Sequence, residues 1–337
     1  MGVSQREMGL ILVLVFIEKS PLDRSPRNCY FDYMNKNLER IGLGTWAFGG
    51  RAYGPMEDDV ARAVVHRALD LGITFFDTAH IYANGRAEEI LGECLPLTAR
   101  VCTKLGYDLS SGKGVKNYAP AFLDQSLDIS LKRLRREQID LLLLHNPPLE
   151  TLKSSGIYSW LSAKIHEGKI AQWGCSIYDS VEEAKLALDA GASAIEARYS
   201  LLRRDIIDDL PKEKWKFEFL ARSPLDGGLL SGKYNGGESF PSTDQRSAMR
   251  ESYFQTNRAY LNELQLLIDD GTVDTFAELA IRFVAFHQPI SRVISGAKSV
   301  SQLEKNIQAV IKGPLPVKAI ELINNLRKIY MPRLLNS

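Results

Sequence analysis

Residues 74–104 read TFFDTAHIYANGRAEEILGECLPLTARVCTK and contain one complete unit of a pattern that runs through the chain. A short apolar run, Thr74–Thr78, is followed by a segment with helical spacing, Ala87–Leu95, and then by a second short run, Arg100–Lys104. Apolar residues at i, i+3 and i+4 indicate a helix that packs one face on a core, and short β-branched or apolar runs indicate strands. This stretch therefore predicts a strand–helix–strand unit.

The same alternation continues on both sides of this unit. Further strands are predicted at Arg40–Trp46, Ile139–His145, Ile170–Ser176, Ala194–Tyr199, Phe217–Arg222 and Arg292–Ser295. Further helices are predicted at Asp58–Leu71, Ala119–Arg136, Val181–Ala190, Thr275–His287 and Val300–Ile311.

Eight strand–helix units in series favour a closed barrel or a doubly wound parallel sheet. The run Ile139–His145, IDLLLLH, is almost continuously apolar, as expected for a parallel strand that is covered on both faces. The first predicted strand leads into IGLGTWAFGG (41–50), which lacks the glycine pattern of a dinucleotide-binding sheet with a helix directly behind it. We therefore predict an α/β fold, a single (β/α)8 TIM barrel, with a long loop after the seventh strand (Ser231 to about Arg258) and a C-terminal helix.

The composition and net charge exclude some classes of function. The chain has 337 residues, of which 45% are hydrophobic and 25% charged, and its formal net charge is +1. This neutral balance offers no electrostatic surface for nucleic acid. The four cysteines (Cys29, Cys94, Cys102 and Cys175) show no CxxC pairing, so neither a disulfide scaffold nor a metal site is expected, and a reducing, cytoplasmic location fits best.

Residues 1–33 differ from the rest of the chain. The run Gly9–Ile17 is apolar but shorter than the roughly 20 residues that span a bilayer. A weak secretory signal is an alternative interpretation, but only Arg6, offset by Glu7, precedes the run and no A-x-A-like cleavage site follows it. We expect a poorly ordered extension, or a true translation start at Met34, with the barrel formed by residues 34–337 and no contact with a membrane.

Ionisable side chains stand at or just after the ends of three consecutive predicted strands: Asp77, Tyr82, Lys104 and His145. Alone, each has a structural explanation, such as a helix cap, a packed tyrosine, a solvated lysine or a hydrogen-bonded histidine. Together they favour an active site, because the carboxyl ends of the parallel strands of a TIM barrel meet on one rim.

The chemistry of these side chains suits the reduction of a carbonyl group. A tyrosine hydroxyl, with a pKa near 10, is a weak acid, and a neighbouring ammonium favours its phenolate. An aspartate keeps the lysine charged and oriented, and a histidine can hold a carbonyl oxygen near the tyrosine. No side chain donates a hydride, so a nicotinamide cofactor would have to supply it.

Several ordered motifs, from about Asn35 to Ala309, resemble those of the aldo-keto reductase family of NADP-dependent oxidoreductases, in its bacterial type. The segment FFDTAHIYANGRAEEILG (75–92) resembles the family block DTA-x-x-Y-G-x-G-x-S-E, with Ala83 and Ala87 in place of Gly and Ser. The segments TKLGY (103–107) and DLLLLHNPP (140–148) supply the lysine and the histidine. RSPLDGGLLSGKY (222–234) resembles a cofactor loop, and VISGAKSVSQLEKNI (293–307) resembles the segment that binds the adenosine 2′-phosphate.

The resemblance implies a (β/α)8 barrel that binds NADPH in an extended form. It implies that Tyr82 is the proton donor, that Asp77 and Lys104 tune it, and that His145 orients the carbonyl. The cofactor residues that it implies are Gly44, Thr45, Trp46, Ser176, Glu196, Arg222, Ser223, Leu225, Gly228, Gly296, Lys298, Ser299, Gln302 and Asn306.

The chain departs from the family pattern at the nicotinamide end of the implied cofactor site. Ile177 replaces the asparagine of a Ser-Asn pair, Glu196 replaces a glutamine, and Arg222 stands where relatives often have an aromatic residue. A carboxylate accepts hydrogen bonds but cannot donate one unless protonated. A guanidinium plane can stack on a ring, although it is not aromatic.

The sequence thus predicts an NADPH-dependent reductase of an aldehyde or ketone, or the reverse oxidation of an alcohol or sugar. An alternative is a nucleotide-binding regulatory subunit similar to potassium-channel β subunits, which acts through a partner protein. Reduction of a nucleotide-linked keto sugar is a variant of the first prediction. The substrate is set by rim loops, and the oligomeric state is left open, with a monomer favoured.

Overall fold

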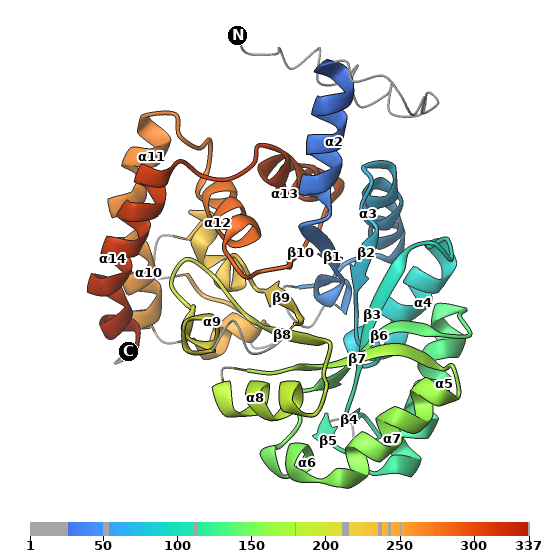
Figure 1. Ribbon diagram of the computed structural model, residues 1–337. Helices are drawn as coiled ribbons and strands as arrows, with labels where there is room; N and C mark the ends of the chain where they lie inside the picture. The colour runs from blue at the N-terminus through green and yellow to red at the C-terminus, as the bar shows by residue number, and fades with distance from the viewer. Residues whose placement is uncertain are drawn as a thin grey trace.

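The computed structural model of the protein describes residues 26–49, 54–110, 114–178, 180–210, 216–234, 238–241, 244–249 and 251–335. Parallel strands close into a barrel in the order β1-β10-β9-β8-β7-β6-β3-β2 (Figure 1). They are β1 (Ile41–Gly44), β2 (Phe75–Asp77), β3 (Arg100–Leu105), β6 (Ile139–His145), β7 (Ile170–Ser176), β8 (Ala194–Arg198), β9 (Glu218–Arg222) and β10 (Arg292–Gly296). Every predicted strand is present, and the predicted single barrel is confirmed.

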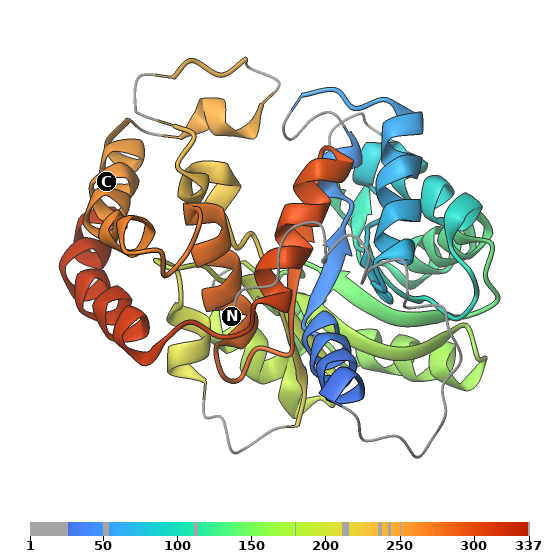
Figure 2. The ribbon, with the colours of Figure 1, turned by 90° about the horizontal axis from the view of Figure 1, so that it is seen from above.

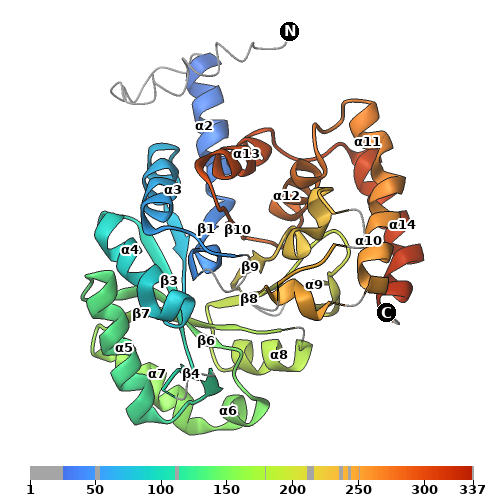
Figure 3. The same cartoon turned by 180° about the vertical axis from the view of Figure 1, so that it is seen from behind.

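Helices cover the outside of the barrel (Figures 1 and 3). Those that match predicted helices are α3 (Asp58–Asp70), α4 (Arg86–Cys94), α5 (Pro120–Leu134), α8 (Val181–Asp189), α12 (Phe276–Phe286) and α13 (Val300–Ile311). The structure adds α6 (Leu149–Lys153), α7 (Ser155–His166), α9 (Asp205–Asp209), α11 (Leu266–Asp269) and the hairpin of β4 (Tyr107–Asp108) and β5 (Val115–Lys116). Short 3-10 helices are η2 (Trp46–Gly49), η3 (Tyr82–Gly85), η4 (Asp226–Ser231) and η5 (Gln245–Ala248).

The strand β6 shows why its sequence is apolar at nearly every position. Leu141 and Leu143 belong to a small cluster inside the barrel, which also contains Phe75 and Leu220. Leu142 and Leu144 belong instead to the larger core between the strands and the helices. Because successive side chains of a strand point to opposite faces, both faces of β6 are buried and neither tolerates a polar surface.

The N-terminal boundary differs from the prediction. Residues 1–25 lie outside the described residues, but helix α2 (Pro26–Leu38) crosses the predicted start at Met34. Met34 and Asn37 are buried, and the Asn37 side chain donates a hydrogen bond to the Ile311 carbonyl at the end of α13 (3.4 Å). These contacts hold the second half of α2 against α13, and a proline is compatible with the first turn of the helix.

The long loop after the seventh barrel strand, β9, is shorter than predicted, because α10 (Glu251–Leu264) begins inside it. Its buried side chains recur with a helical period, and they are Tyr253, Phe254, Asn257, Tyr260, Leu261 and Leu264. The predicted C-terminal helix, α14 (Val317–Leu335), packs along α10 on the outside of the barrel (Figure 2). The contact of α10 with α14 is a tertiary contact. Because no local pattern records such a contact, the sequence predicted a loop for this segment.

Two further expectations concern the membrane and the cysteines. In the described part of the chain, no helix combines the length and the apolar character that crossing a bilayer requires. The described cysteines, Cys94, Cys102 and Cys175, are free thiols. Cys29 lies in α2, but the structure does not describe its side chain.

The close approach of β7 and β8 gives a test of the fold. A Cβ atom added at Gly174 would overlap the carbonyl oxygen of Ala194 on the neighbouring strand. We expect Gly174→Ala to lower the free energy of unfolding by about 1–3 kcal/mol, because the backbone must shift. The matched control is Gly156→Ala at the start of α7, where the added Cβ would meet its nearest neighbour at 3.5 Å. Urea unfolding should show little change in the control, and equal stability of both variants would contradict the predicted clash.

Candidate active site

The predicted catalytic residues converge on one rim because their strands are neighbours in the barrel. The barrel order places β2 beside β3 and β3 beside β6. Asp77 is the last residue of β2, Lys104 lies one residue before the end of β3, and His145 is the last residue of β6. Tyr82 follows β2 at the start of η3. The structure therefore brings all four side chains together at the carboxyl ends of the strands.

The ammonium of Lys104 is the centre of this cluster. Its side chain is fully buried, it contacts the Asp77 carboxylate, and it donates a hydrogen bond to the Thr78 carbonyl (2.9 Å). A second carboxylate, that of Glu196 on β8, lies 3.2 Å away. Burial disfavours the charged form, but the two carboxylates outweigh it and hold the pKa of Lys104 well above its usual value.

The hydroxyl of Tyr82 stays protonated in this environment. The Lys104 ammonium lies 5.4 Å from the centroid of the Tyr82 ring and lowers the pKa of the hydroxyl, as the sequence predicted. The net pKa is nevertheless raised, because burial outweighs the ammonium and the carboxylates of Asp77 and Glu196 add to the effect. The net pKa of Tyr82 therefore depends on burial and on Glu196 as well as on the lysine that the sequence predicted.

His145 is a neutral imidazole beside the tyrosine. The centroids of the His145 and Tyr82 rings are 6.1 Å apart. Burial, aided by the Lys104 ammonium, holds the pKa of His145 well below its usual value, so the ring carries one N–H and one free lone pair at neutral pH. Its Nδ1 atom is buried without a hydrogen-bond partner among the described residues. A buried polar atom without a partner points to a missing ligand atom.

The carboxyl of Asp77 completes the set. Its pKa is raised by burial and by the neighbouring Glu196 carboxylate, against the opposing effect of Lys104. Asp77, Cys102 and Glu196 each place one ligand atom within 4.8 Å of the others. The Lys104 ammonium already contacts both carboxylates there, so it supplies the positive charge that a metal ion would supply.

The loop that carries Tyr82 is held in an unusual backbone conformation. Ala83 and Asn84 both have left-handed dihedral angles (φ 53° and 54°), and Gly85 follows with φ 94°. The guanidinium of Arg133 on α5 donates hydrogen bonds to the carbonyls of His80 (3.4 Å) and Asn84 (3.3 Å), which flank Tyr82. A side chain at residue 85 would overlap this guanidinium. Arg133 thus fixes the loop from outside the barrel.

A buried carboxylate ties this support to β3. Glu88 is fully buried, accepts a hydrogen bond from the Thr103 hydroxyl (2.7 Å) and lies 3.3 Å from Arg133. His80 approaches the Lys104 carbonyl at 2.8 Å through its Nδ1. The sequence analysis did not single out His80, Glu88 or Arg133. Glu88 stands in the motif that carries Asp77 and Tyr82, and that position was the available signal.

The predicted cofactor residues lie along adjoining strand ends. Gly44, Ser176, Arg222 and Gly296 end β1, β7, β9 and β10, and Glu196 lies on β8 between β7 and β9 in the barrel. The remaining residues follow these ends or lie on α13, and they are Thr45, Trp46, Ser223, Leu225, Gly228, Lys298, Ser299, Gln302 and Asn306. One continuous arc of the rim, from β1 to β7, therefore carries all of them.

Several of these side chains also shape the backbone. The Thr45 hydroxyl donates a hydrogen bond to the Asp77 carbonyl (3.0 Å) and so joins the ends of β1 and β2. The Ser299 hydroxyl caps α13 by accepting a hydrogen bond from the Gln302 backbone (3.2 Å). The Asn306 amide donates to the Gly296 carbonyl (3.2 Å). The half-exposed Trp46 instead packs its ring 4.7 Å from the ring of Tyr82.

The residues that depart from the family pattern touch one another. The Ser176 hydroxyl donates to Glu196 Oε1 (3.0 Å), and Arg222 Nε lies 3.7 Å from the same oxygen. Arg222 also donates a hydrogen bond to the backbone carbonyl of Ile177 (3.1 Å), whose side chain is fully buried. The side chains of Glu196 and Arg222 therefore form one cluster rather than two separate contacts.

The loop after β9 has a backbone suited to close approach. Ser223, Asp226, Gly227 and Gly228 all have positive φ values. The Asp226 carboxylate accepts a hydrogen bond from the Tyr253 hydroxyl on α10. Helix α10, which the sequence did not predict, thus anchors the loop that carries Ser223, Leu225 and Gly228.

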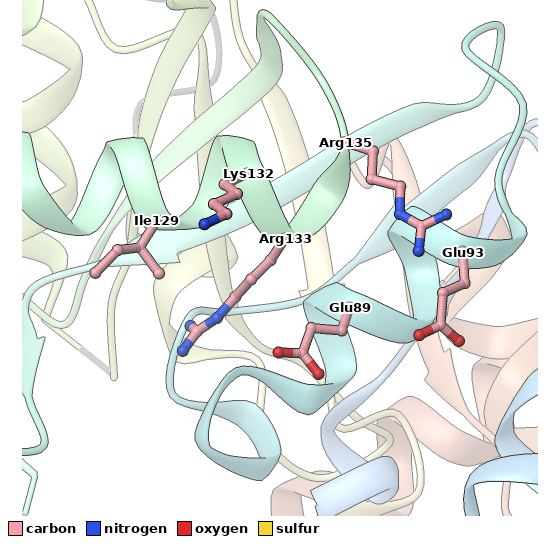
Figure 4. A pocket seen from close by; sticks show the side chains of 6 residues that line it. All are labelled: Glu89, Glu93, Ile129, Lys132, Arg133 and Arg135. Carbon is pink, nitrogen blue, oxygen red and sulfur yellow. The ribbon is translucent and has the colours of Figure 1, made fainter.

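A groove of about 450 Å³ lies between α4 and α5 on the outside of the barrel. Figure 4 shows the carboxylates of Glu89 and Glu93 on α4 facing basic side chains from α5 and its carboxyl end. Glu93 pairs with Arg62 (2.9 Å), and Glu89 pairs with Arg86 (2.8 Å). The lining contains none of the predicted catalytic or cofactor residues, so this groove is separate from the site.

Comparison with known proteins adds four findings. Residues 40–328 match a family described as the aldo/keto reductase family. The chain is 31% identical over 306 residues to a probable voltage-gated potassium channel subunit beta of Arabidopsis thaliana, covering 83% of this chain and 92% of the plant protein. It is 28% identical over 293 residues to the NADP(+) aldo-keto reductase yakc of Schizosaccharomyces pombe, covering 82% and 85%. The glycerol dehydrogenase structure from Gluconobacter oxydans matches with a TM-score of 0.76 and 30% identity, covering 87% and 92%.

The strained loop gives a test of local stability. A left-handed conformation costs an alanine roughly 1–2 kcal/mol, whereas glycine adopts it readily. We expect Ala83→Gly to raise the free energy of unfolding by about 0.5–1 kcal/mol in urea denaturation. Asn84→Gly is the matched control and should gain less, because asparagine tolerates this conformation better than alanine does. A loss of stability in Ala83→Gly would contradict the assigned backbone.

Proposed function

The chain belongs to the aldo/keto reductase family, and from this premise we propose that it reduces the carbonyl group of an aldehyde or ketone with NADPH, or catalyses the reverse oxidation of an alcohol or sugar. The observation that carries the proposal is the pairing of a protonated Tyr82 with a neutral His145 whose Nδ1 has no described partner. Two neutral groups that can hydrogen-bond the same oxygen atom suit a carbonyl substrate better than an anionic one.

The proposed mechanism assigns one task to each side chain. The Tyr82 hydroxyl donates its proton to the carbonyl oxygen as negative charge develops there. The His145 imidazole hydrogen-bonds the same oxygen and keeps it beside the hydroxyl. The Lys104 ammonium stabilises the phenolate that remains, and Asp77 holds this ammonium in place. When bound, NADPH supplies the hydride for the carbonyl carbon.

The residues of the rim fit an anionic dinucleotide. Lys298 precedes the N-terminus of α13, where free backbone N–H groups and the helix dipole favour a phosphate. A hydrogen bond from the Lys298 backbone N–H to the Gln302 side chain (2.8 Å) closes the turn before α13. We assign the 2′-phosphate to Lys298 and the nicotinamide end to the region of Ser176, Glu196 and Arg222. The name of the fission-yeast relative supports NADP over NAD.

A small-molecule substrate and a cytoplasmic location belong to the same proposal. The name of the Gluconobacter neighbour, a glycerol dehydrogenase, supports small alcohols and their carbonyl products as substrates. The buried thiols of Cys102 and Cys175 are compatible with a reducing compartment.

The first test removes the proton donor. Tyr82→Phe keeps the ring that packs on Trp46 and removes only the hydroxyl, so we expect kcat for carbonyl reduction to fall by about 10²–10⁴-fold. The affinity for NADPH, followed by quenching of protein fluorescence, should change little. Consumption of NADPH by the unchanged protein against a panel of aldehydes, ketones and sugars provides the reference rate. An undiminished kcat in Tyr82→Phe would refute the mechanism.

The second test concerns the cofactor. Lys298→Gln removes one charge opposite the phosphate and should weaken NADPH binding about tenfold or more, while NADH binding stays nearly constant. Lys305→Gln on the same helix is the matched control, because Lys305 is exposed and outside the predicted site. Equal affinity of the unchanged protein for NADPH and NADH would contradict the proposed preference.

A second candidate function follows from the similarity to the plant channel subunit. In this case, the barrel binds the nucleotide but acts mainly through a partner protein. Nucleotide binding without turnover of any carbonyl or alcohol in the substrate panel would favour this candidate. Turnover that Tyr82→Phe abolishes would favour the reductase.

A further inference from the structure

Glu196 is buried among donors from three strands. Only 1% of its surface is exposed, yet it meets the Lys104 ammonium of β3 (3.2 Å), the Ser176 hydroxyl of β7 (3.0 Å) and the Arg222 guanidinium of β9 (3.7 Å). Its two oxygens are divided between these partners: Oε2 faces Lys104, and Oε1 faces Ser176 and Arg222. Oε1 accepts the Ser176 hydrogen bond, whereas Oε2 faces the Lys104 ammonium without a hydrogen bond among the described residues.

A second cation beside Glu196 stabilises this cluster, because burial and Glu196 raise the pKa of Asp77 against the effect of Lys104. Asp77 and Glu196 both face the single ammonium of Lys104, and a buried carboxylate without a counter-charge is strongly unfavourable. Arg222 supplies the second positive charge on the rim side of Glu196. Lys104 thus lies between Asp77 and Glu196, and Glu196 lies between Lys104 and Arg222.

The position of Arg222 is fixed independently of Glu196. Its guanidinium donates to the Ile177 carbonyl (3.1 Å) and lies 5.8 Å from the centroid of the Tyr178 ring. These contacts hold the charge over the end of β7, next to Glu196 on the adjoining strand. Arg222 is thus a placed counter-charge, and the two departures from the family pattern compensate each other.

We propose that Glu196 and Arg222 form one charge-balanced unit with Lys104, and that Glu196 is a positioning residue that sets how much of the lysine charge acts on Tyr82. Lys104 and Arg222 face Tyr82 with positive charge, Asp77 and Glu196 face it with negative charge, and the neutral His145 packs beside it. An ammonium shared by two carboxylates stabilises a phenolate less than one held by a single carboxylate. The catalytic consequence rests on the proposed function, whereas the charge pairing does not.

The pairing is tested without any activity measurement. Glu196→Gln leaves Arg222 and Lys104 with only Asp77 to balance them, and Arg222→Gln leaves two carboxylates around Lys104. Glu196→Gln is isosteric, whereas Arg222→Gln also removes the guanidinium that donates to the Ile177 carbonyl, and each single variant should lower Tm. The double variant should recover most of the summed loss, because it removes both charges of the pair. Additive losses in Tm would overturn the proposed unit.

The positioning role is tested by the pH profile of catalysis. Glu196→Gln removes a negative charge near Tyr82, so the hydroxyl should ionise at lower pH. Carbonyl reduction requires the protonated hydroxyl, so the alkaline limb of the pH profile for reduction should move to lower pH by about one unit. At a fixed pH below that limb, the rate of alcohol oxidation should rise about tenfold to match. An alkaline limb that does not move would overturn the positioning role.

Glu218→Gln is the matched control for both tests. Glu218 pairs with Arg100 (2.7 Å) at the amino ends of β9 and β3, so the same substitution breaks an ion pair at the opposite end of the barrel. This variant should leave the pH profile in place, and an equal shift in it would overturn the assignment to Glu196. If no carbonyl or alcohol is turned over, the proposed function fails while the Tm measurements still decide the pairing.

Discussion

A lysine ammonium enclosed in protein, without exposure to water, imposes the main constraint on this molecule. Lys104 can stay charged only with counter-charges in contact, and these come from β2 (Asp77) and β8 (Glu196), on either side of the barrel interior. Closure of the barrel is what brings these strands within reach of one ammonium. The same charge helps to keep His145 neutral and opposes the effect of burial on the Tyr82 hydroxyl. Burial and this one ion together set the protonation states of the site.

The support for Tyr82 lies partly outside the barrel. Its loop has a left-handed alanine, Ala83, which is unfavourable unless its surroundings hold it. Arg133 on α5 bonds the carbonyls on both sides of the tyrosine, and Glu88 on α4 joins this arginine to β3. The outer helices thus contribute to the geometry of the rim as well as to the hydrophobic core. This connection explains why a fully buried glutamate belongs to the motif that carries the proton donor.

The nicotinamide end of the proposed cofactor site shows how a fold can accept changes of charge. Neither a glutamate at position 196 nor an arginine at position 222 would be easily tolerated alone, because each would leave a charge with an incomplete set of partners. Side by side, they balance each other. Whatever binds at this end meets an ion pair rather than an amide and an aromatic ring. The specificity of the enzyme is expected to reflect that difference.

The sequence by itself determined the eight strands, most of the outer helices and the four residues of the proposed catalytic rim, because strand ends and helical periods are local patterns. Tertiary structure alone decided that Glu196 and Arg222 are partners, since only the pairing of β8 with β9 in the closed barrel brings them together. It also decided the start of α10 and the extension of α2 before Met34, and these two helices contact α14 and α13 respectively. The net pKa shift of Tyr82 depends on the tertiary structure for the same reason: burial is a property of the folded chain, and no local pattern records it.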